Sequence, residues 1–212
     1  MIVYAIADIH GRADRLTRIR EMVREHRPDI LVAAGDLMDR KDPEPVARCL
    51  GSLDLPVLLV RGNTDPAAHM APITALPNVT DLHLSAVTRK GFRFSGIGGT
   101  VMLPLRSRIA WRERALLEAA AALLTPQTVL VVHPPPRGCR DRVLGRIHAG
   151  SSGIAELMHR HHPLMVICGH IHEAAGAKQV EGTTIVNCTM GAGGSGAIIR
   201  LASVTGPEVI FP

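Results

Sequence analysis

The sequence predicts an α/β (α+β) fold in which two stacked mixed β-sheets are flanked by helices. Apolar runs of strand length first alternate with helical segments, an alternating stretch then indicates a hairpin, and consecutive strands end the chain. Each sheet must cover its apolar face with another layer, so this order favours two packed sheets with helices outside. Because no repeat or flexible linker interrupts the pattern, we expect residues 1–212 to form a single domain.

The N-terminal part is expected to alternate strand and helix. Three short apolar runs are typical of buried strands: residues 2–7, 30–35 and 56–62. A helix is predicted at residues 13–26, because apolar side chains recur there on one face. Pro43 and Pro45 open a second helix that ends near Gly51, since proline is tolerated in a first turn. Residues 66–75 are predicted to form a helix or a turn.

The rest of the chain is predicted to add a hairpin, two helices and further strands. Residues 81–99 alternate in polarity around a Lys-Gly turn, as antiparallel hairpins do. Residues 109–124 form the longest expected helix, and Ser151 or Ser152 suits the N-cap of a helix that runs to His161. Strands are also expected at residues 128–133, 164–170, 183–188, 196–204 and 208–211. Because the last three are consecutive, they suggest a second sheet packed on the first.

The composition limits the expected cellular location of the protein and the classes of molecule it can bind. The chain is 46% hydrophobic but only 2% aromatic, so Val, Ile, Leu and Ala must form the core. It has no apolar run long enough for a membrane helix and no basic leader, so we expect a cytoplasmic protein without a membrane partner. The net charge of +5 comes from scattered arginines, which indicate either solvated helix faces or attraction of anionic substrates. The four cysteines lack a C-x-x-C pair and are expected to be reduced and buried.

Side chains that bind metals lie on five short segments, each directly after an apolar run. They are Asp8, His10, Asp36, Asn63, His133, His170 and His172. Ligands gather at the carboxyl ends of strands in open α/β sheets, and alternate residues of a strand face one side. Unrelated polar residues at strand ends would explain any one segment, but explain five poorly. Seven oxygen and imidazole donors exceed one tetrahedral ion, so we expect two divalent transition-metal ions that share a carboxylate, with Mn foremost and Fe, Zn or Ni as alternatives.

The ordered motifs D-x-H, G-D-x-x-D-R, G-N-x-D, a histidine before prolines and G-H-x-H resemble those of the calcineurin-like metallophosphoesterases. The resemblance implies a two-sheet sandwich with a dinuclear centre. It implies that one ion is bound by Asp8, His10, Asp36 and His172. It implies that the other ion is bound by Asp36, Asn63, His133 and His170, so that Asp36 is shared. Asp39 and Arg40 of the second motif would support the surrounding loop.

The third motif departs from the usual pattern. Many family members have Gly-Asn-His-Glu or Gly-Asn-His-Asp, whereas this chain has Thr64 in place of the histidine. A threonine hydroxyl can donate a hydrogen bond but does not titrate near neutrality. Smaller members that lack the histidine resemble phosphodiesterases. The resemblance therefore implies hydrolysis of phosphodiesters or small phosphate monoesters, with a metal-bound hydroxide as nucleophile.

Candidate catalytic and substrate-binding residues lie near the metal motifs. Asn63 and Asp65 are the catalytic candidates. The candidates for the leaving-group acid are Asp65, His69 and His148. Arg12 and Arg137 follow metal-binding segments and are candidates to clamp a phosphate, as is His148, which precedes a Gly-Ser-Ser-Gly turn. A solvated surface position is the alternative for all three. The glycine-rich residues 191–196 are predicted to form a hairpin or loop near the site.

Two other functions stay open at the level of sequence. A non-catalytic binding scaffold on the same fold is one, although a scaffold can lose metal ligands and this chain retains all seven. A nuclease is the other, but single-stranded nucleic acid needs stacking aromatics, which are scarce here. The expected partner is therefore a small phosphate ester and not nucleic acid. A homo-oligomer is compatible with the sequence.

Overall fold

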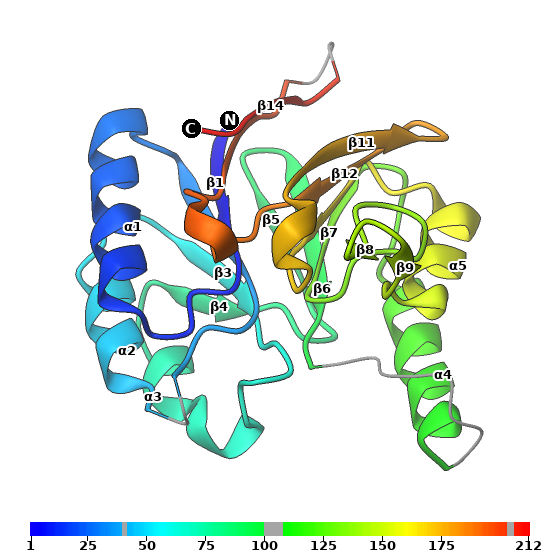
Figure 1. Ribbon diagram of the computed structural model, residues 1–212, viewed down its shortest axis with the longest axis horizontal. Helices are drawn as coiled ribbons and strands as arrows, with labels where there is room; N and C mark the ends of the chain where they lie inside the picture. The colour runs from blue at the N-terminus through cyan, green and yellow to red at the C-terminus, as the bar shows by residue number, and fades with distance from the viewer. Residues whose placement is uncertain (40–41, 100–107, 203–205) are drawn as a thin grey trace.

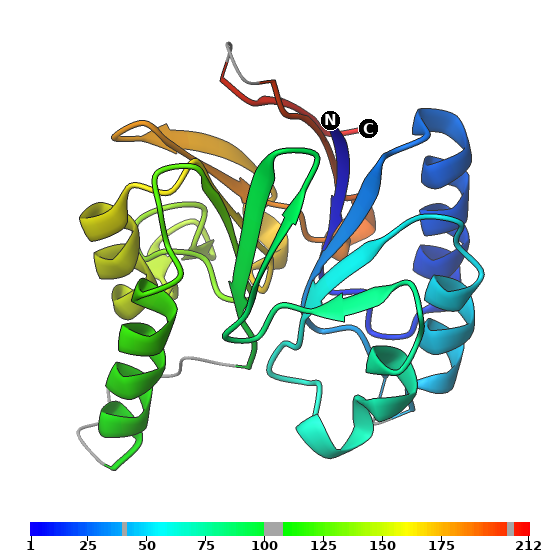
Figure 2. The same cartoon turned by 180° about the vertical axis from the view of Figure 1, so that it is seen from behind.

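The computed structural model describes residues 1–39, 42–99, 108–202 and 206–212, and the side chains of 108–113 lie outside this description. Two sheets of six strands face each other, and helices cover their outer faces (Figures 1 and 2). This confirms the predicted fold class. The helices are α1 (Ala13–His26), α2 (Glu44–Gly51), α3 (Ala71–Thr74), α4 (Arg108–Ala121) and α5 (Ser152–His161), with short 3-10 turns η1 (Ala67–His69), η2 (His172–Ala174) and η3 (Gly191–Gly193).

The first sheet has the strand order β14-β13-β1-β2-β3-β4. Its strands are β1 (Ile2–Ile6), β2 (Ile30–Ala34), β3 (Val57–Val60), β4 (Val79–Asp81), β13 (Ala197–Arg200) and β14 (Glu208–Ile210). β1 to β4 run parallel, whereas β13 and β14 add antiparallel strands at one edge. The carboxyl ends of β1, β2 and β3 therefore lie along one side of the sheet.

The second sheet has the order β11-β12-β10-β7-β6-β5. Its strands are β5 (Ala86–Arg89), β6 (Phe92–Ile97), β7 (Thr128–Val132), β10 (Met165–Cys168), β11 (Gly176–Val180) and β12 (Thr183–Asn187). The four central strands are parallel, and β5 and β11 are antiparallel edges. A separate two-stranded ribbon of β8 (Arg142–Val143) and β9 (Ile147–His148) lies in the segment between β7 and α5.

Strand periodicity explains why the parallel strands are apolar throughout. In β1, Tyr4 and Ile6 face α1 and α2, whereas Val3 and Ala5 face the second sheet. Both faces of the strand are therefore buried, and successive side chains enter different cores. A third cluster packs the second sheet against α4 and α5. Aliphatic side chains such as Val3, Ala5 and Ile167 fill the layer between the sheets, as the low aromatic content predicts.

Helix boundaries follow the local signals. In α1, Leu16, Ile19 and Met22 are buried, and Arg27 ends the helix in the left-handed conformation. In α5, Ser151 is the N-cap, because its hydroxyl accepts a hydrogen bond from the amide of Ile154 at 3.2 Å. These two predictions are confirmed. Helices α4 and α1 both have 14 residues, so α4 shares the predicted place of longest helix among the described residues. It ends at Ala121 instead of residue 124, because the chain tightens there into hydrogen bonds between residues i and i+3.

The predicted antiparallel hairpin around Lys90-Gly91 is confirmed for β5 and β6, although it is shorter than residues 81–99, because Asp81 instead pairs in parallel with β3 of the first sheet. The prediction for the last strands is wrong. The final strands do not form one sheet: β12 joins the second sheet, whereas β13 and β14 join the first. Strand β11 was not predicted, because its half-exposed residues lack an apolar run. Part of the strand predicted at residues 196–204 lies outside the described residues.

None of the helices within the described residues is long and apolar enough to cross a bilayer. The four cysteines are free thiols in buried positions, as predicted: Cys49, Cys139, Cys168 and Cys188.

Candidate metal centre

The predicted metal ligands meet where the carboxyl ends of the two sheets come together. Asp8 and His10 follow β1, Asp36 follows β2 and Asn63 follows β3. His133 follows β7 of the other sheet, and His170 and His172 follow β10. The backbone connects the two sheets at this edge, because the amide of Met190 donates to the carbonyl of Ala7 at 2.9 Å. Segments far apart in sequence thus form one site.

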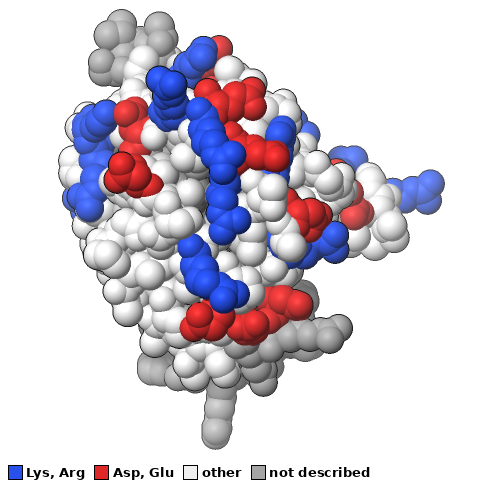
Figure 3. Space-filling model, turned by 90° about the vertical axis from the view of Figure 1, so that its left-hand side faces the viewer, with Lys and Arg blue, Asp and Glu red and all other residues white. Residues whose placement is uncertain are grey.

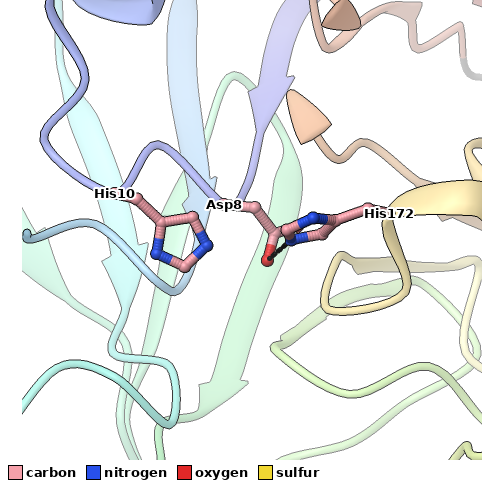
Figure 4. Close-up of side chains that lie close together, drawn as sticks. All are labelled: Asp8, His10 and His172. Carbon is pink, nitrogen blue, oxygen red and sulfur yellow. Dashed lines mark ion pairs between the residues drawn. The ribbon is translucent and has the colours of Figure 1, made fainter. Parts of the chain in front are cut away.

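The side chains form two clusters. Asp8, His10 and His172 make up the first, and the potential ligand atoms in each cluster lie within 4.8 Å of one another. In Figure 4, Asp8 lies between the rings of the two histidines. The second cluster consists of Asp36, His133 and His170. The family resemblance implies one ion for each cluster, with Asp36 as a ligand of both ions and Asn63 as a further ligand of the second.

Four of the candidate ligands have a left-handed backbone conformation. Asp8, His10, Asp36 and His170 all have positive φ angles, of 58°, 49°, 52° and 71°. A residue with a Cβ in this region costs on the order of 1–3 kcal/mol, and such residues persist only where the surroundings hold them. The amide of Asp8 donates to Gly35 at 2.9 Å and that of His10 donates to Asp36 at 2.9 Å. The loops after β1 and β2 therefore hold each other in the conformation that directs the side chains.

Two glycines are required because the ligands approach the backbone closely. A Cβ on Gly62 would overlap the carboxylate and the amide of Asp36. A Cβ on Gly191 would overlap the ring of His172. Neither overlap can be relieved by moving a flexible side-chain end, because both neighbours are themselves held. The glycines of G-N-x-D and of the glycine-rich loop thus allow the two clusters to pack tightly.

In the first cluster, the carboxylate of Asp8 is fully buried. It accepts a hydrogen bond from the amide of His170 at 3.0 Å, and the Nε2 of His172 is 3.3 Å from it. Burial alone would raise the pKa of Asp8, but the hydrogen bond from His172 and the charge of His133 hold it below its usual value. Contact with Asp8 raises the pKa of His172. The site therefore keeps a buried carboxylate ionised, as cation binding requires.

Asp36 lies between the two clusters. Its Oδ2 is 3.4 Å from Nε2 of His133 and 3.9 Å from Nε2 of His10, so a histidine from each cluster approaches one oxygen. Its Oδ1 accepts from the amide of Thr64 at 2.9 Å. Burial raises the pKa of Asp36, but the hydrogen bond and charge of His133, with the Thr64 amide, lower it to about 2. This carboxylate is in the right place to be shared by two ions.

The surroundings of His133 indicate how it would bind a cation. Its Nδ1 is 2.9 Å from the carbonyl of Ala34, which can only accept, so Nδ1 carries a proton. Its Nε2 is 2.9 Å from Oδ1 of Asn63 and 3.2 Å from Nδ1 of His170. Burial and the charge of His133 lower the pKa of His170, which favours its neutral form. Nε2 of His133 therefore lies between an amide oxygen and an imidazole nitrogen, and a proton or a cation there would be shared among these three atoms. These donors fit a transition-metal ion.

A family model described as calcineurin-like phosphoesterase matches residues 1–174, well over half of the chain. The chain belongs to the calcineurin-like phosphoesterase family. It is 34% identical over 114 residues to a UPF0046 protein of Caenorhabditis elegans, covering 53% of this chain and 38% of that protein. It is 25% identical over 186 residues to a probable cyclic nucleotide phosphodiesterase of Rhodococcus erythropolis, covering 79% of this chain and 61% of that protein. The chain thus spans less than two thirds of the length of both relatives.

The fold has relatives among solved structures. The crystal structure of TT1561 of Thermus thermophilus superimposes with a TM-score of 0.74, and the match covers 99% of this chain and 98% of that chain. At 18% identity this likeness concerns the fold alone. It agrees with the two-sheet sandwich that the family resemblance implies.

Within this calcineurin-like phosphoesterase, the surroundings of Asp65 support positioning and not proton donation. Asp65 is 1% exposed. Its oxygens accept hydrogen bonds from the amides of Leu37, Met38 and Gly62 at 2.8–3.0 Å. The carboxylate therefore joins the loop that follows Asp36 to the loop that precedes Asn63. It faces three donors, which is unsuitable for an acid that must release a proton to a leaving group.

The supporting residues of the second motif are only partly described. Asp39 forms an isolated bridge with Asp42, and the amide of Asp42 donates to the carbonyl of Asp39 at 2.7 Å. A Cβ on Gly11 would lie 2.9 Å from the amide of Asp39, so the two motif loops are in contact. Asp39 thus lies beside the loop that carries His10. Arg40, which was predicted to share this role, lies outside the described residues.

The structure separates the predicted substrate-binding residues. Arg12 pairs with Asp14 at 3.1 Å and lines a cavity beside the first cluster. His148 lies in β9, where its Nδ1 is 2.7 Å from the buried carboxylate of Asp141, and it lines a different cavity of about 680 Å³. Arg137 is exposed and donates to the carbonyl of His148 at 3.2 Å. Arg12 is therefore on the α1 side of the centre, and the other two are on the β8–β9 side.

Sequence reasoning overlooked three residues near these cavities. Arg15 and Arg18 line the same cavity as Arg12. The sequence could have indicated this, because the three arginines are spaced three residues apart along one helix. Asp141 orients His148 and accepts from the amides of Gly138 at 3.0 Å and Gly150 at 3.1 Å. Nothing in its local sequence indicates this role, since its partners become neighbours only when the loop folds.

Proposed function

We propose that the chain is a metal-dependent phosphoesterase that hydrolyses phosphodiesters or small phosphate monoesters at a dinuclear centre. The observation that carries this proposal is the position of Asp36 between two donor clusters. Two divalent ions bound there would supply positive charge to the phosphoryl oxygens and activate a water molecule for in-line attack. The ligands of one ion would be Asp8, His10 and His172, those of the other Asn63, His133 and His170, with Asp36 shared.

The donor chemistry supports transition metals, with Mn foremost and Fe, Zn or Ni as alternatives. Carboxylate and amide oxygens accompany imidazole nitrogens among the proposed ligands, and no cysteine is among them. The four thiols are instead buried within the core. A mixed oxygen and nitrogen set suits ions of intermediate softness, whereas calcium prefers oxygen ligands alone.

The chain's own residues contribute mainly orientation. The carbonyl of Ala34 holds the proton of His133 on Nδ1, so that Nε2 faces the site. Asp65 holds the loops that carry Asp36 and Asn63 at a fixed separation. In phosphoryl transfer, positioning and charge supply most of the barrier lowering, so these contacts serve catalysis without touching the reacting atoms.

Thr64 influences which esters are good substrates. Its side chain is exposed beside Asp36, at the place where many relatives have a histidine. Because threonine has no proton that titrates near neutrality, the departing oxygen receives no proton from this position. We therefore expect rates to depend strongly on the acidity of the leaving group. The name of the Rhodococcus relative supports testing phosphodiesters, including cyclic nucleotides, before other substrates.

The test is hydrolysis by protein that has been stripped of metal and reloaded with Mn, Fe, Ni, Zn or Mg. An aryl phosphodiester and an aryl phosphate monoester are compared, with Asp36→Ala as the inactive variant. Asp54→Ala removes one exposed carboxylate away from the site and is the matched control. We expect about two ions per chain, turnover that requires Mn or a similar ion, and a loss of at least about 1,000-fold in Asp36→Ala.

The proposal fails if the protein binds two ions but hydrolyses neither diesters, monoesters nor cyclic nucleotides. That result would favour the binding scaffold. The completeness of both clusters argues against a scaffold, because a protein that only binds partners has no need of seven converging donors.

A further inference from the structure

Three arginines at the start of α1 line a cavity beside the first cluster. Arg12, Arg15 and Arg18 form one wall, and residues 192–195 of the glycine-rich loop form the other. The cavity, which we call the arginine pocket, has a volume of about 410 Å³. Figure 3 shows the face that carries α1, where Lys and Arg side chains form a column. The three arginines are spaced three residues apart, so they lie on one side of α1.

Two of these side chains are held by the walls of the pocket. Arg15 donates from Nη1 to the carbonyl of Asp8. Arg18 donates from Nε to the hydroxyl of Ser195 at 2.9 Å. A guanidinium group has five N–H donors, so one bond to a wall orients the group and leaves other donors for a ligand. Much of the entropy cost of ordering the side chains is therefore already met before a ligand binds.

Positive charge exceeds negative charge in the pocket. Asp14 is the one acid among the described lining residues, and it pairs with Arg12 at 3.1 Å. Arg18 approaches Glu21 at 3.4 Å on the exposed side of the helix. Arg15 has no carboxylate within 4.0 Å among the described residues, and it lies between Arg12 and Arg18 along the helix. An anion bound here would relieve the repulsion between neighbouring guanidinium groups.

The opposite wall suits close approach by an anion. It consists of Ala192, Gly193, Gly194 and Ser195, so few side-chain atoms project into the cavity. Ala192 has a φ of 49° and Gly193 a φ of 83°, and the turn they form brings the backbone to the surface. Phosphate groups in proteins frequently contact such exposed backbone. The loop therefore adds a polar, uncrowded wall to the three cations.

The pocket adjoins the metal centre on two sides. Arg15 is bonded to the carbonyl of Asp8, whose carboxylate belongs to the first cluster. Gly191, directly before the loop wall, packs against the ring of His172. A ligand in the arginine pocket would thus lie next to a group held at the first cluster. One molecule with two anionic groups can contact both places.

We propose that the arginine pocket binds a second phosphate group of the substrate while the ester to be hydrolysed lies at the metal centre. A planar guanidinium group can direct two N–H donors at two phosphate oxygens. The pocket has three such groups, and the single carboxylate of Asp14 cannot neutralise all of them. The substrate class is therefore an organic phosphoester that carries a separate, non-reacting phosphate. This inference rests on the proposed function, because it treats the metal clusters as the place of hydrolysis.

The test compares ligands with one and two phosphates on the metal-loaded protein. Adenosine 3′,5′-bisphosphate, adenosine 5′-monophosphate and inorganic phosphate are titrated by calorimetry, and each is also measured as an inhibitor of aryl phosphodiester hydrolysis. We expect the bisphosphate to bind at least about 10-fold more tightly than the monophosphate at low salt. Because Coulomb attraction is screened, we expect this preference to shrink as salt is raised.

Variants of α1 localise the effect. Arg18→Met keeps a long apolar side chain but removes the charge, and it leaves the metal ligands untouched. Arg24→Met is the matched control, because Arg24 is exposed on the same helix outside the pocket. We expect Arg18→Met to weaken bisphosphate binding about 5- to 10-fold and monophosphate binding less than 2-fold, with unchanged metal content and unfolding temperature. Ser195→Ala, which frees Arg18, should give a smaller loss in the same direction.

Calorimetry distinguishes failure of this inference from failure of the proposed function. Equal binding of the two nucleotides, or equal losses in Arg18→Met and Arg24→Met, would overturn the inference even if the protein is an active phosphoesterase. The inference would also be overturned if inorganic phosphate bound as tightly as the bisphosphate and this binding were lost in Arg18→Met, because the pocket would then hold free anions only. A preference for the bisphosphate that depends on Arg18, without turnover of any ester, would support the pocket and reject the proposed function.

Discussion

Replacing Asp65 with alanine should destabilise the protein and empty the metal centre together. Its carboxylate is buried and accepts from three backbone amides, those of Leu37, Met38 and Gly62. Leu37 directly follows Asp36, and Gly62 directly precedes Asn63. Asp65→Ala therefore leaves three amides without acceptors and releases the two loops that present metal ligands.

The size of the effect can be worked out from these contacts. Each buried donor that loses its partner costs about 1–3 kcal/mol, and water entering the space left by the carboxylate reduces the sum. Removal of one partner from a buried charged network typically costs about 3–5 kcal/mol, which we take as the expected loss. For a chain of this size the unfolding temperature should fall by about 6–20 °C. Asp65→Asn retains one acceptor oxygen and should lose about half as much.

The assay combines unfolding with metal analysis and kinetics. Thermal unfolding is followed for the metal-free wild type, Asp65→Ala, Asp65→Asn and the exposed control Asp54→Ala, which removes one negative charge as Asp65→Ala does. Metal content and hydrolysis are then measured on aryl esters with leaving groups of different acidity. A positioning residue should lower metal content, and should lower the rate by a similar factor for every leaving group.

Two results would refute this reasoning. One is an Asp65→Ala protein whose free energy of unfolding is within about 1 kcal/mol of that of the wild type, because three unpaired buried amides should lower it by more than that. The other is normal metal content with a rate loss that grows as the leaving group becomes more basic. That pattern is expected of a general acid and would restore Asp65 as the proton donor.

Three other perturbations test the glycine contacts, a buried carboxylate and the thiols. Gly62→Ala should reduce metal binding and hydrolysis by at least about 100-fold, because its Cβ would overlap Asp36. Burial would raise the pKa of Asp141, but the amides of Gly138 and Gly150 and contact with His148 lower it. The ionised carboxylate of Asp141 therefore stabilises the fold fully above about pH 4, and this stabilisation is lost as pH falls through the lowered pKa. The unfolding curves of wild type and Asp141→Asn should accordingly converge in acid. Burial raises the pKa of all four cysteines, so a thiol reagent should label none rapidly in the native protein and 4 after denaturation.

Each of these predictions has a control or a contradicting outcome. Gly206→Ala introduces the same methyl group into open space, and equal behaviour of the two glycine variants would disprove the overlap argument. A constant stability difference between wild type and Asp141→Asn from neutral to strongly acidic pH would show that Asp141 does not act through its charge. Rapid labelling of a native thiol would show that at least one cysteine becomes accessible without unfolding.

Local patterns predicted most helices and strands because their causes are local. The face formed by Leu16, Ile19 and Met22 in α1 is recorded in the spacing of those residues. The cap of α5 depends on Ser151 and an amide three residues later. Strand β11 had no such signal, since it lies at a sheet edge where only part of each side chain is buried.

Strand partners depended on contacts between distant residues. β13 and β1 pair with Ile2 opposite Arg200, and no short window of sequence contains both. The same is true of β4, which joins β3 although an alternating pattern continues directly after it. A strand pairs where its two faces are best buried, and that depends on which surfaces the rest of the chain provides.

The linear sequence was enough to predict the apolar runs, the order of the metal-binding motifs and the identity of the candidate ligands. The ligands could be identified because metal chemistry restricts which side chains can bind an ion after a strand. Folding in three dimensions was needed to reveal that Asp36 lies between two clusters, that Asp65 holds two loops and that Arg12, Arg15 and Arg18 adjoin the centre. These relations are distances between residues far apart in the chain. The contact of Asp65 needs only the neighbouring strands β2 and β3 of the first sheet. The contact of Asp36 with His133 exists only after the two sheets have packed, because the shared core brings the loops of both sheets to one edge.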